Sequence, residues 1–240
     1  MAHLTGESKR QYVAGMFARI AERYDLMNDL MTAGLHRRWK RETARLASYG
    51  LQGKALDVAT GTGDLVLALA RCPGIEQSVG VDLLPQMIAA ARKKAKCRRM
   101  GGKATWVLGD ALQLPFPEGT FACATAGFSL RNMTDLHGAL AEMVRVVRPG
   151  GRITTLELSP MPRGPKSVLI RWCFHRVVPL MGQIVAGDRA AYTYLPQSVD
   201  RFLDADHLAS LLRGLGLTGV GYSRLGFGTV TLHWGDRPSN

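Results

Sequence analysis

Two carboxylates enclose a short glycine-bearing turn in the first third of the chain. Asp57 stands near the end of an apolar run, Gly61 and Gly63 follow, and Asp64 comes directly before a helical pattern. This order predicts a strand, a turn and a helix. Because glycine has no Cβ, a ligand can lie against bare backbone where the helix begins. The turn therefore predicts a cradle for a nucleotide-like ligand.

The residues around this turn distinguish between the common nucleotides. A dinucleotide site needs a third glycine three residues after Gly63, and a P-loop needs a lysine, but neither is present. Asp57 and Asp64 would repel a pyrophosphate and attract a cationic group. S-adenosylmethionine, a nucleoside with an ammonium and a sulfonium group, fits that description. A plain strand-to-helix turn, with glycines for geometry alone, stays open at this point.

Further acids follow the next two predicted strands. Asp82 ends the strand 79–82, 25 residues after Asp57, close to the ~20-residue separation at which an acid meets ribose hydroxyls. Asp110 follows the strand 104–108 and could accept a hydrogen bond from an exocyclic amine such as that of adenine. Met87, in the helix after Asp82, offers an apolar wall for a nucleobase.

Candidate catalytic residues lie in two other places. Arg131 and Asn132 follow the strand 121–126, at the sheet edge where open α/β sheets bind their ligands. Tyr24 and His36 belong to a polar and aromatic cluster in the predicted N-terminal helical layer, 12–49. An alternative reading of this cluster, as helix caps and rim residues, stays open.

The whole pattern predicts an α/β fold in one domain, 1–240. Strands alternate with helices, which implies a mostly parallel sheet, and 219–223 with 229–234 predicts a closing β-hairpin. Residues 159–203 break the alternation and are rich in apolar, basic and aromatic residues. We expect a lid-like insertion there, suited to a greasy substrate or to a membrane contact.

Composition restricts the remaining classes. The net charge of +12 is compatible with RNA or with an anionic membrane surface and cannot choose between them. The basic run 92–99 ends a helical pattern and is expected to be a solvated face. The four cysteines have neither zinc-site nor disulfide-scaffold spacing, and no secretion signal or membrane span is evident, so we expect a cytoplasmic protein.

Several stretches together resemble the class I S-adenosylmethionine-dependent methyltransferases, and within them the UbiE/MenG group that C-methylates quinol precursors of menaquinone and ubiquinone. The stretches that carry this resemblance are 17–31, 34–41, 56–64, 114–117 and 130–132. The resemblance implies a Rossmann-like fold with a seven-stranded sheet. It also implies that Thr62 lies at the cofactor turn, Asp82 at the ribose, and Asp110 with Ala111 at the adenine. Gly127 departs from the pattern, because some members have a cofactor-contacting serine there.

The chemistry implied by the resemblance needs S-adenosylmethionine, a prenylated quinol and no metal. Arg131 could stabilise the phenolate or polarise a water acting as base, His36 is a rival base, and Asn132 with Tyr24 would orient the ring. An RNA methyltransferase and a non-catalytic nucleotide-binding protein remain alternatives, although no nucleic-acid module is found. The menaquinone or ubiquinone pathway, peripheral contact with an anionic membrane and the oligomeric state, a homodimer included, stay open.

Overall fold

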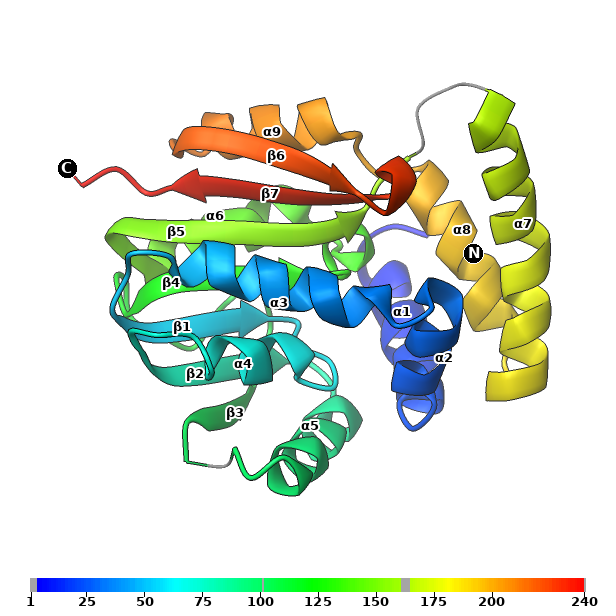
Figure 1. The fold of residues 1–240 in the computed structure, drawn as a ribbon, viewed down its shortest axis with the longest axis horizontal. Helices are drawn as coiled ribbons and strands as arrows, with labels where there is room; N and C mark the ends of the chain where they lie inside the picture. Colours follow the sequence, from blue (N-terminus) through cyan, green and yellow to red (C-terminus); the bar gives the residue numbers. More distant parts are fainter. Residues whose placement is uncertain (1–3, 101, 161–164, 240) are drawn as a thin grey trace.

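The computed structural model describes residues 4–100, 102–160 and 165–239, with side chains described from 170 onward in the last range. A seven-stranded sheet in the order β3-β2-β1-β4-β5-β7-β6 forms its centre (Figure 1). Five neighbouring strands are parallel, and β7 runs antiparallel to both β5 and β6. The strands are β1 (Gly53–Val58), β2 (Ile75–Asp82), β3 (Ala104–Leu108), β4 (Phe121–Gly127), β5 (Val147–Leu158), β6 (Thr218–Leu225) and β7 (Val230–Asp236).

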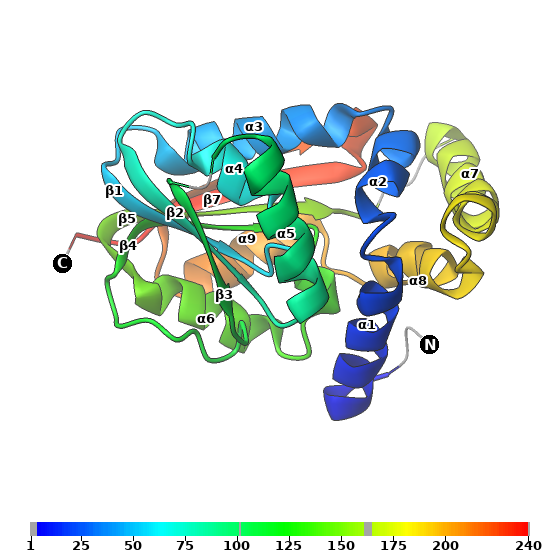
Figure 2. The same cartoon turned by 90° about the horizontal axis from the view of Figure 1, so that it is seen from below.

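Helices cover both faces of this sheet (Figure 2). One face carries α3 (Leu35–Ser48), α4 (Asp64–Leu69) and α5 (Pro85–Cys97), and the other carries α6 (Leu136–Val146) and α9 (Ala205–Gly214). Successive residues of β1 point to opposite faces. Leu56 accordingly packs with Leu140 and Leu208, while Ala55 packs with Ala44 and Leu69. The sheet is therefore buried on both sides, as parallel strands require.

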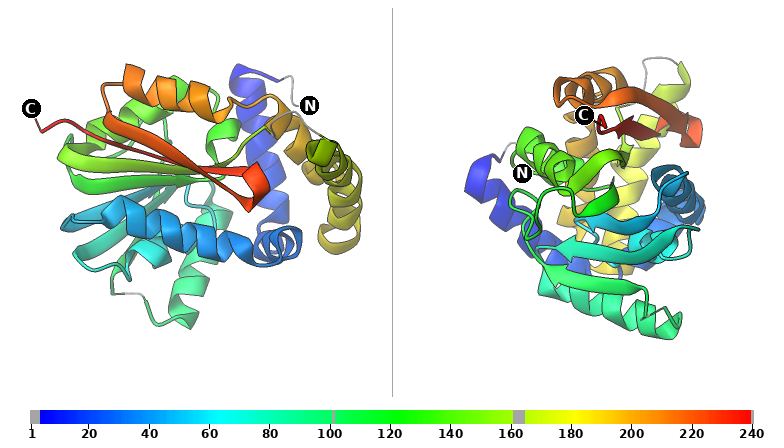
Figure 3. Two further views of the ribbon diagram at one scale, coloured as in Figure 1. Left: turned by 45° about the horizontal axis from the view of Figure 1, so that its top comes forward. Right: turned by 90° about the vertical axis from the view of Figure 1, so that its left-hand side faces the viewer.

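A helical cap lies at the edge where the parallel strands end. It consists of α1 (Gly6–Ile20), α2 (Tyr24–Thr32), α7 (Pro165–Met181), the π-helical turn η2 (Gly182–Ala186) and α8 (Arg189–Asp200). Figures 1 and 3 show α7 as its outermost helix, beyond α8. The cap has its own apolar cluster, which includes Met16, Ile20, Met27, Tyr192 and Tyr194. This arrangement encloses space between the cap and the sheet.

The predicted seven-stranded, mostly parallel sheet with a C-terminal hairpin, N-terminal helices and an inserted lid is confirmed. One boundary differs from the prediction: the N-terminal helices begin at Gly6, ahead of the predicted start at residue 12. The predicted lid, 159–203, forms two helices, with residues 161–164 outside the described part. Within that part, no helix combines the length and the apolar character that crossing a bilayer requires.

Candidate functional site

A first cavity, of about 150 Å³, opens at the carboxyl edge of the parallel strands, beneath α1. Five of the residues predicted to hold the cofactor line it: Gly61, Asp82, Met87, Asp110 and Ala111. They reach it from the ends of three neighbouring strands and from the first turn of α5. The carboxyl ends of the parallel strands therefore bring these five residues together, at the edge where open α/β sheets bind their ligands.

Asp82 is the most firmly placed acid of this cavity. One carboxylate oxygen accepts the Gly61 N–H at 2.7 Å, and the other accepts the Leu84 N–H at 2.9 Å. Burial raises the pKa of Asp82, against the opposite effect of these backbone hydrogen bonds. A carboxylate offers about four lone-pair sites. Two acceptor sites therefore remain for a ligand, which suits the paired hydroxyls of a ribose.

Asp57 lies beneath the turn, and the first cavity does not reach it. Its carboxylate is buried and accepts the hydroxyls of Thr60 at 2.6 Å and Thr125 at 2.7 Å. Burial raises the pKa of Asp57 to about 7, although these hydrogen bonds lower it. The role of Asp57 as a cofactor ligand stays a prediction. Its observed contacts tie the glycine turn to β4, which makes it a residue that shapes the turn.

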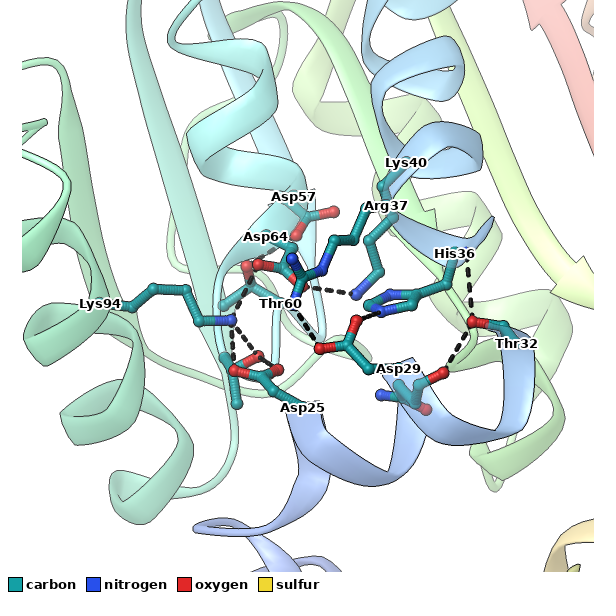
Figure 4. Close-up of polar contacts among 12 residues, drawn as sticks. Asp25, Asp29, Thr32, His36, Arg37, Lys40, Asp57, Thr60, Asp64 and Lys94 are labelled. Atoms are coloured by element: carbon teal, nitrogen blue, oxygen red, sulfur yellow. Dashed lines mark hydrogen bonds and ion pairs between the residues drawn. The ribbon is translucent and has the colours of Figure 1, made fainter. Parts of the chain in front are cut away.

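Asp64 is not free to attract a cationic ligand (Figure 4). Its carboxylate forms ion pairs with Lys40 at 3.0 Å and with Lys94 at 2.8 Å. Burial alone would raise the pKa of Asp64, but the two ammonium groups hold it well below its usual range. The argument that this charge selects a cationic nucleoside is therefore wrong. Lys94 also corrects the reading of the run 92–99 as a purely solvated face.

Thr62 and Gly63 hold the turn and do not line the first cavity. The Thr62 hydroxyl donates to Asp25 of α2 at 2.6 Å and accepts from Lys94 at 2.8 Å. Gly63 has a φ of 81°, and a Cβ there would lie 2.3 Å from the ring of Trp106. Any side chain at this position would therefore collide with β3. These contacts make both residues part of the scaffold of the turn.

The end of β4 supplies another wall of the first cavity. Gly127 lies against α4, where a Cβ would come within 2.5 Å of the Leu65 side chain. Phe128 follows with a φ of 59°, a strained backbone for a residue with a side chain. Ser129 also lines the cavity, and its buried hydroxyl has no hydrogen-bond partner within the described ranges. Ser129 therefore contributes a residue to this wall and keeps a covered hydroxyl without a partner.

Helix α1 covers the first cavity and is tied to its floor. Arg10, which lines the cavity, forms an ion pair with Asp110 at 2.8 Å. The Lys9 ammonium donates to the backbone oxygens of Arg131 at 3.1 Å and Met133 at 2.6 Å. The pairing with Arg10 was not anticipated for Asp110. One carboxylate oxygen of Asp110, the residue predicted to bind the adenine, therefore already forms an ion pair with Arg10.

A second cavity, of about 510 Å³, lies between the sheet edge and the helical cap. Its walls are mostly apolar and come from α1, α2, α3, α7 and α8. Three predicted catalytic residues line it: Tyr24, His36 and Arg131. Asn132 lines the first cavity instead, and its side-chain oxygen accepts the Tyr194 hydroxyl at 3.2 Å. The four predicted catalytic residues therefore divide between two neighbouring cavities.

The two cavities share three aromatic residues. Phe17, Tyr24 and Phe128 line both of them, so their side chains mark the junction. Phe17 and Tyr24 also contact each other edge to face, with ring centroids 5.9 Å apart. A group held in the first cavity and a group held in the second can meet only at this junction. The geometry therefore suits a transfer between a ligand held at the strand ends and a ligand held under the helical cap.

His36 is held by an acid that the sequence reading did not single out. Its Nε2 lies 2.8 Å from Asp29, which also binds Arg37 (Figure 4). The imidazole is buried, and its Nδ1 has no hydrogen-bond partner in the part of the chain that the structure describes. Burial lowers the pKa of His36, against the raising effect of Asp29. This combination favours a neutral imidazole at the wall of the second cavity, with an unpartnered Nδ1 that surrounding atoms cover.

Arg131 is held by Glu157, a second acidic residue that the sequence did not lead us to single out. Glu157, fully buried near the end of β5, lies 2.5 Å from the Arg131 guanidinium, which also donates to the Phe128 backbone oxygen at 2.7 Å. Glu157 stands at the end of an apolar run, so the rule that identified Asp82 could have identified it as well. A guanidinium keeps its proton at any ordinary pH and cannot act as a base by itself. Arg131 is therefore a fixed positive charge.

The seven-stranded fold, with a cavity and strand-end acids at the carboxyl edge of its parallel strands, is that of the class I S-adenosylmethionine-dependent methyltransferases. Among solved structures, the chain is similar to an S-adenosylmethionine-dependent methyltransferase from Thermotoga maritima, described as a possible histamine N-methyltransferase. The TM-score is 0.65 at 16% identity, with 93% of this chain and 99% of that chain covered. At that identity the similarity concerns the fold alone.

The family follows from the sequence comparisons. The model of the ubiE/COQ5 methyltransferase family matches residues 5–237, and the chain belongs to this family. It is 44% identical to a demethylmenaquinone methyltransferase of Thermus thermophilus, over 93% of this chain and all of that protein. It is 40% identical to the ubiquinone/menaquinone biosynthesis C-methyltransferase UbiE of Cereibacter sphaeroides, over 95% of this chain and 91% of that protein.

Proposed function

We propose that this protein transfers the methyl group of S-adenosylmethionine to a ring carbon of a prenylated quinol, converting demethylmenaquinol to menaquinol. The observation that carries the proposal is the meeting, at Phe17, Tyr24 and Phe128, of a cavity that contains the strand-end acids Asp82 and Asp110 with a larger cavity under the helical cap. The demethylmenaquinone methyltransferase of Thermus thermophilus supports the same substrate class. The ubiquinone-pathway benzoquinol is the nearest competing acceptor.

The first cavity fits S-adenosylmethionine. Asp82 has acceptor sites left for the ribose, and Ala111 with Met87 offers an apolar wall for the adenine. The unpartnered Ser129 hydroxyl supplies a hydrogen-bonding group of the kind that Gly127 lacks. When bound, the cofactor supplies an electrophilic methyl group on its sulfonium.

The residues of the second cavity prepare the acceptor. A quinol ring carbon becomes a better nucleophile when the neighbouring hydroxyl loses its proton. His36 takes that proton on Nδ1, while Asp29 holds Nε2 and stabilises the imidazolium that forms. Arg131, fixed by Glu157, lowers the energy of the phenolate through its positive charge. Tyr24 lies at the junction, where it can orient the ring.

The apolar walls of the second cavity contribute to the proposed reaction in two ways. They exclude water from the reacting centre, so that the charges of Arg131 and His36 act in a medium of low dielectric constant. They also accommodate the part of the prenyl tail nearest the ring, since aliphatic and aromatic side chains form most of them. The remaining tail belongs to a lipid bilayer. We therefore propose that the protein is cytoplasmic and works in peripheral contact with an anionic membrane, to which its charge of +12 is complementary.

The direct test is a methyl-transfer assay. Purified protein is incubated with methyl-labelled S-adenosylmethionine and reduced short-chain demethylmenaquinol in detergent, and the lipid extract is analysed by mass spectrometry. The proposal predicts one added methyl group, on a ring carbon. It fails if no quinol gains label under conditions in which calorimetry shows cofactor binding. Label found on added RNA instead would favour the nucleic-acid alternative.

A further inference from the structure

Exposed apolar side chains are concentrated at one end of the molecule. The described part of the chain exposes eleven large apolar side chains. Eight of them lie on the helical cap, at the first residue of α3 or on the turn η3 (Gly226–Gly228): Leu26, Leu30, Leu35, Trp172, Val177, Leu180, Ile184 and Phe227. Monomeric proteins rarely expose so much apolar surface in one region unless it contacts a partner.

Three of these side chains surround the mouth of the second cavity. Leu30 of α2, Leu35 of α3 and Phe227 are 47%, 44% and 96% exposed, and all three also line the cavity. Residues that line a cavity and face solvent at the same time mark its opening. We call these three residues the apolar rim. Figure 2 shows that α2, the start of α3 and the end of the β6–β7 hairpin lie on the same side of the molecule.

Phe227 is held outward by its own turn. It has a φ of 58°, a conformation that side chains rarely adopt, between two glycines that also have positive φ. Gly226 packs against Trp39 so closely that a Cβ there would lie 2.9 Å from the indole. The turn is thus fixed on a buried tryptophan while the phenyl ring projects into solvent. Both the strain and the exposure cost free energy, which indicates a contact missing from the isolated chain.

Basic residues accompany the rim. Arg38 is exposed and follows Leu35 by one helical turn, so both side chains lie on the same face of α3. Arg171, also exposed, lines the cavity on the side of α7. Apolar side chains beside arginines suit the boundary between acyl chains and anionic headgroups. A contact with a protein partner would not explain why the second cavity opens at the apolar rim, whereas a contact with a membrane that holds the lipid substrate would.

We infer that the apolar rim inserts into an anionic lipid bilayer and that the prenylated quinol enters the second cavity directly from the membrane between Leu30, Leu35 and Phe227. This inference rests on the proposed function for the identity of the lipid that enters. It assigns the rim as the membrane-facing surface of the protein. The outer face of α7, with Trp172 and Leu180, extends the same apolar surface.

The test measures binding of the full chain to vesicles that contain no quinol. Vesicles of phosphatidylcholine, with or without phosphatidylglycerol, are sedimented with the wild type, Phe227→Ser, Arg38→Gln and Tyr49→Ser. Tyr49 is the matched control, because it is 78% exposed but lies at the opposite end of α3. Phe227→Ser should weaken vesicle binding about tenfold. Arg38→Gln should weaken binding about fivefold, and only with phosphatidylglycerol. Tyr49→Ser should match the wild type.

Two outcomes would overturn the inference. In one, Phe227→Ser and Tyr49→Ser bind vesicles as well as the wild type does. In the other, sedimentation shows that Phe227→Ser dissociates a dimer while vesicle binding is unchanged, which would assign the rim to a contact between two copies. A melting temperature equal to that of the wild type confirms that each variant is folded.

A second readout separates this inference from the proposed function. The ratio of kcat/KM for quinol embedded in vesicles to kcat/KM for the same quinol in detergent should fall about tenfold in Phe227→Ser. If the wild type methylates no quinol in either medium while its vesicle binding still depends on Phe227, the proposed substrate is wrong and the membrane surface stands. If the ratio equals that of the wild type, entry through the rim is refuted.

Discussion

The two cavities of this protein are built by different means. The first is formed by residues at the ends of parallel strands, where Asp82 receives two backbone N–H groups. The second is enclosed by side chains of the helical cap and α3 together with residues near the ends of β4 and β5 and in η3, and its polar residues are held by other side chains, such as Asp29 and Glu157. Backbone geometry thus fixes the cofactor site, whereas packing fixes the acceptor site. Substitutions in the first cavity should therefore affect the binding of the cofactor, and substitutions of the polar residues in the second should affect turnover.

The largest expected effect concerns the base in the second cavity. His36→Gln removes the group proposed above to accept the quinol proton, so kcat should fall about 10²- to 10⁴-fold. The dissociation constant of S-adenosylmethionine should stay within about twofold, since His36 does not line the first cavity. Steady-state kinetics and calorimetry measure the two quantities.

His207→Gln is the control for this substitution. His207 also pairs with an aspartate, Asp204 at 2.8 Å, but it is exposed and remote from both cavities. Its kcat should equal that of the wild type. A His36→Gln enzyme with normal turnover would show that His36 is not the base. It would favour the alternative in which Arg131 polarises a water molecule that acts as the base.

The next largest effect concerns the stability of the cap-facing sheet edge. Glu157→Ala leaves the buried charge of Arg131 without its partner, which should lower the free energy of unfolding by about 3–5 kcal/mol. Glu157→Gln keeps a hydrogen-bond acceptor and should cost less. Urea denaturation followed by circular dichroism gives the values.

Glu118→Ala provides the comparison for Glu157. Glu118 pairs with Arg237 at the surface, at 2.5 Å, and its removal should leave the denaturation curve unchanged. Equal curves for Glu157→Ala and Glu118→Ala would mean that burial of the Arg131 pair contributes nothing to folding.

The pH dependence of turnover tests the protonation state of His36. Burial lowers the pKa of His36 below its ordinary 6.5, so the neutral, proton-accepting form prevails at neutral pH. The acid limb of kcat should therefore lie below pH 6.5. Asp29 favours the protonated form, so Asp29→Asn should lower the pKa further and move the limb to still lower pH. A limb that moves upward in Asp29→Asn would contradict the assignment.

The smallest effect concerns one hydrogen bond in the first cavity. Ser129→Ala should weaken the binding of S-adenosylmethionine about fivefold to tenfold, the usual value of one buried hydrogen bond. Thr155→Val is the control, because the Thr155 hydroxyl is likewise buried without a partner in the described segments but does not line this cavity. Isothermal calorimetry distinguishes the two. Equal dissociation constants for both variants would remove Ser129 from the cofactor site.

The sequence predicted the sheet-derived part of the site better than the helical part. Asp82 and Asp110 follow recognisable strands, and strand ends converge whatever the distant packing is. The role of Asp64 was misjudged because its partners, Lys40 and Lys94, lie on two other helices. A charge that looks free in the sequence can be neutralised by such distant residues. The contacts of Asp57 were equally hidden in the sequence, since Thr125, which donates to it, belongs to β4.

In the second cavity, the sequence analysis likewise missed residues whose contacts depend on the tertiary structure. His36 and Arg131 were singled out by residue type, but Asp29 and Glu157, which orient them, were not. Periodicity identifies a helix and its apolar face, yet it cannot tell which acid of α2 meets which residue of α3. That pairing depends on how the helices pack, and packing is set by the whole core.

The most direct test of the division between the two cavities is an equilibrium titration of two ligands into two variants. Asp82→Asn changes only the first cavity, and Ile170→Ser changes only the second, from α7. S-adenosylmethionine and a short-chain demethylmenaquinone are titrated separately into each protein. The account predicts that Asp82→Asn weakens only the nucleoside, by about tenfold, and that Ile170→Ser weakens only the quinone, by about fivefold. Loss of both ligands in either variant, or loss of the opposite ligand, would contradict the account.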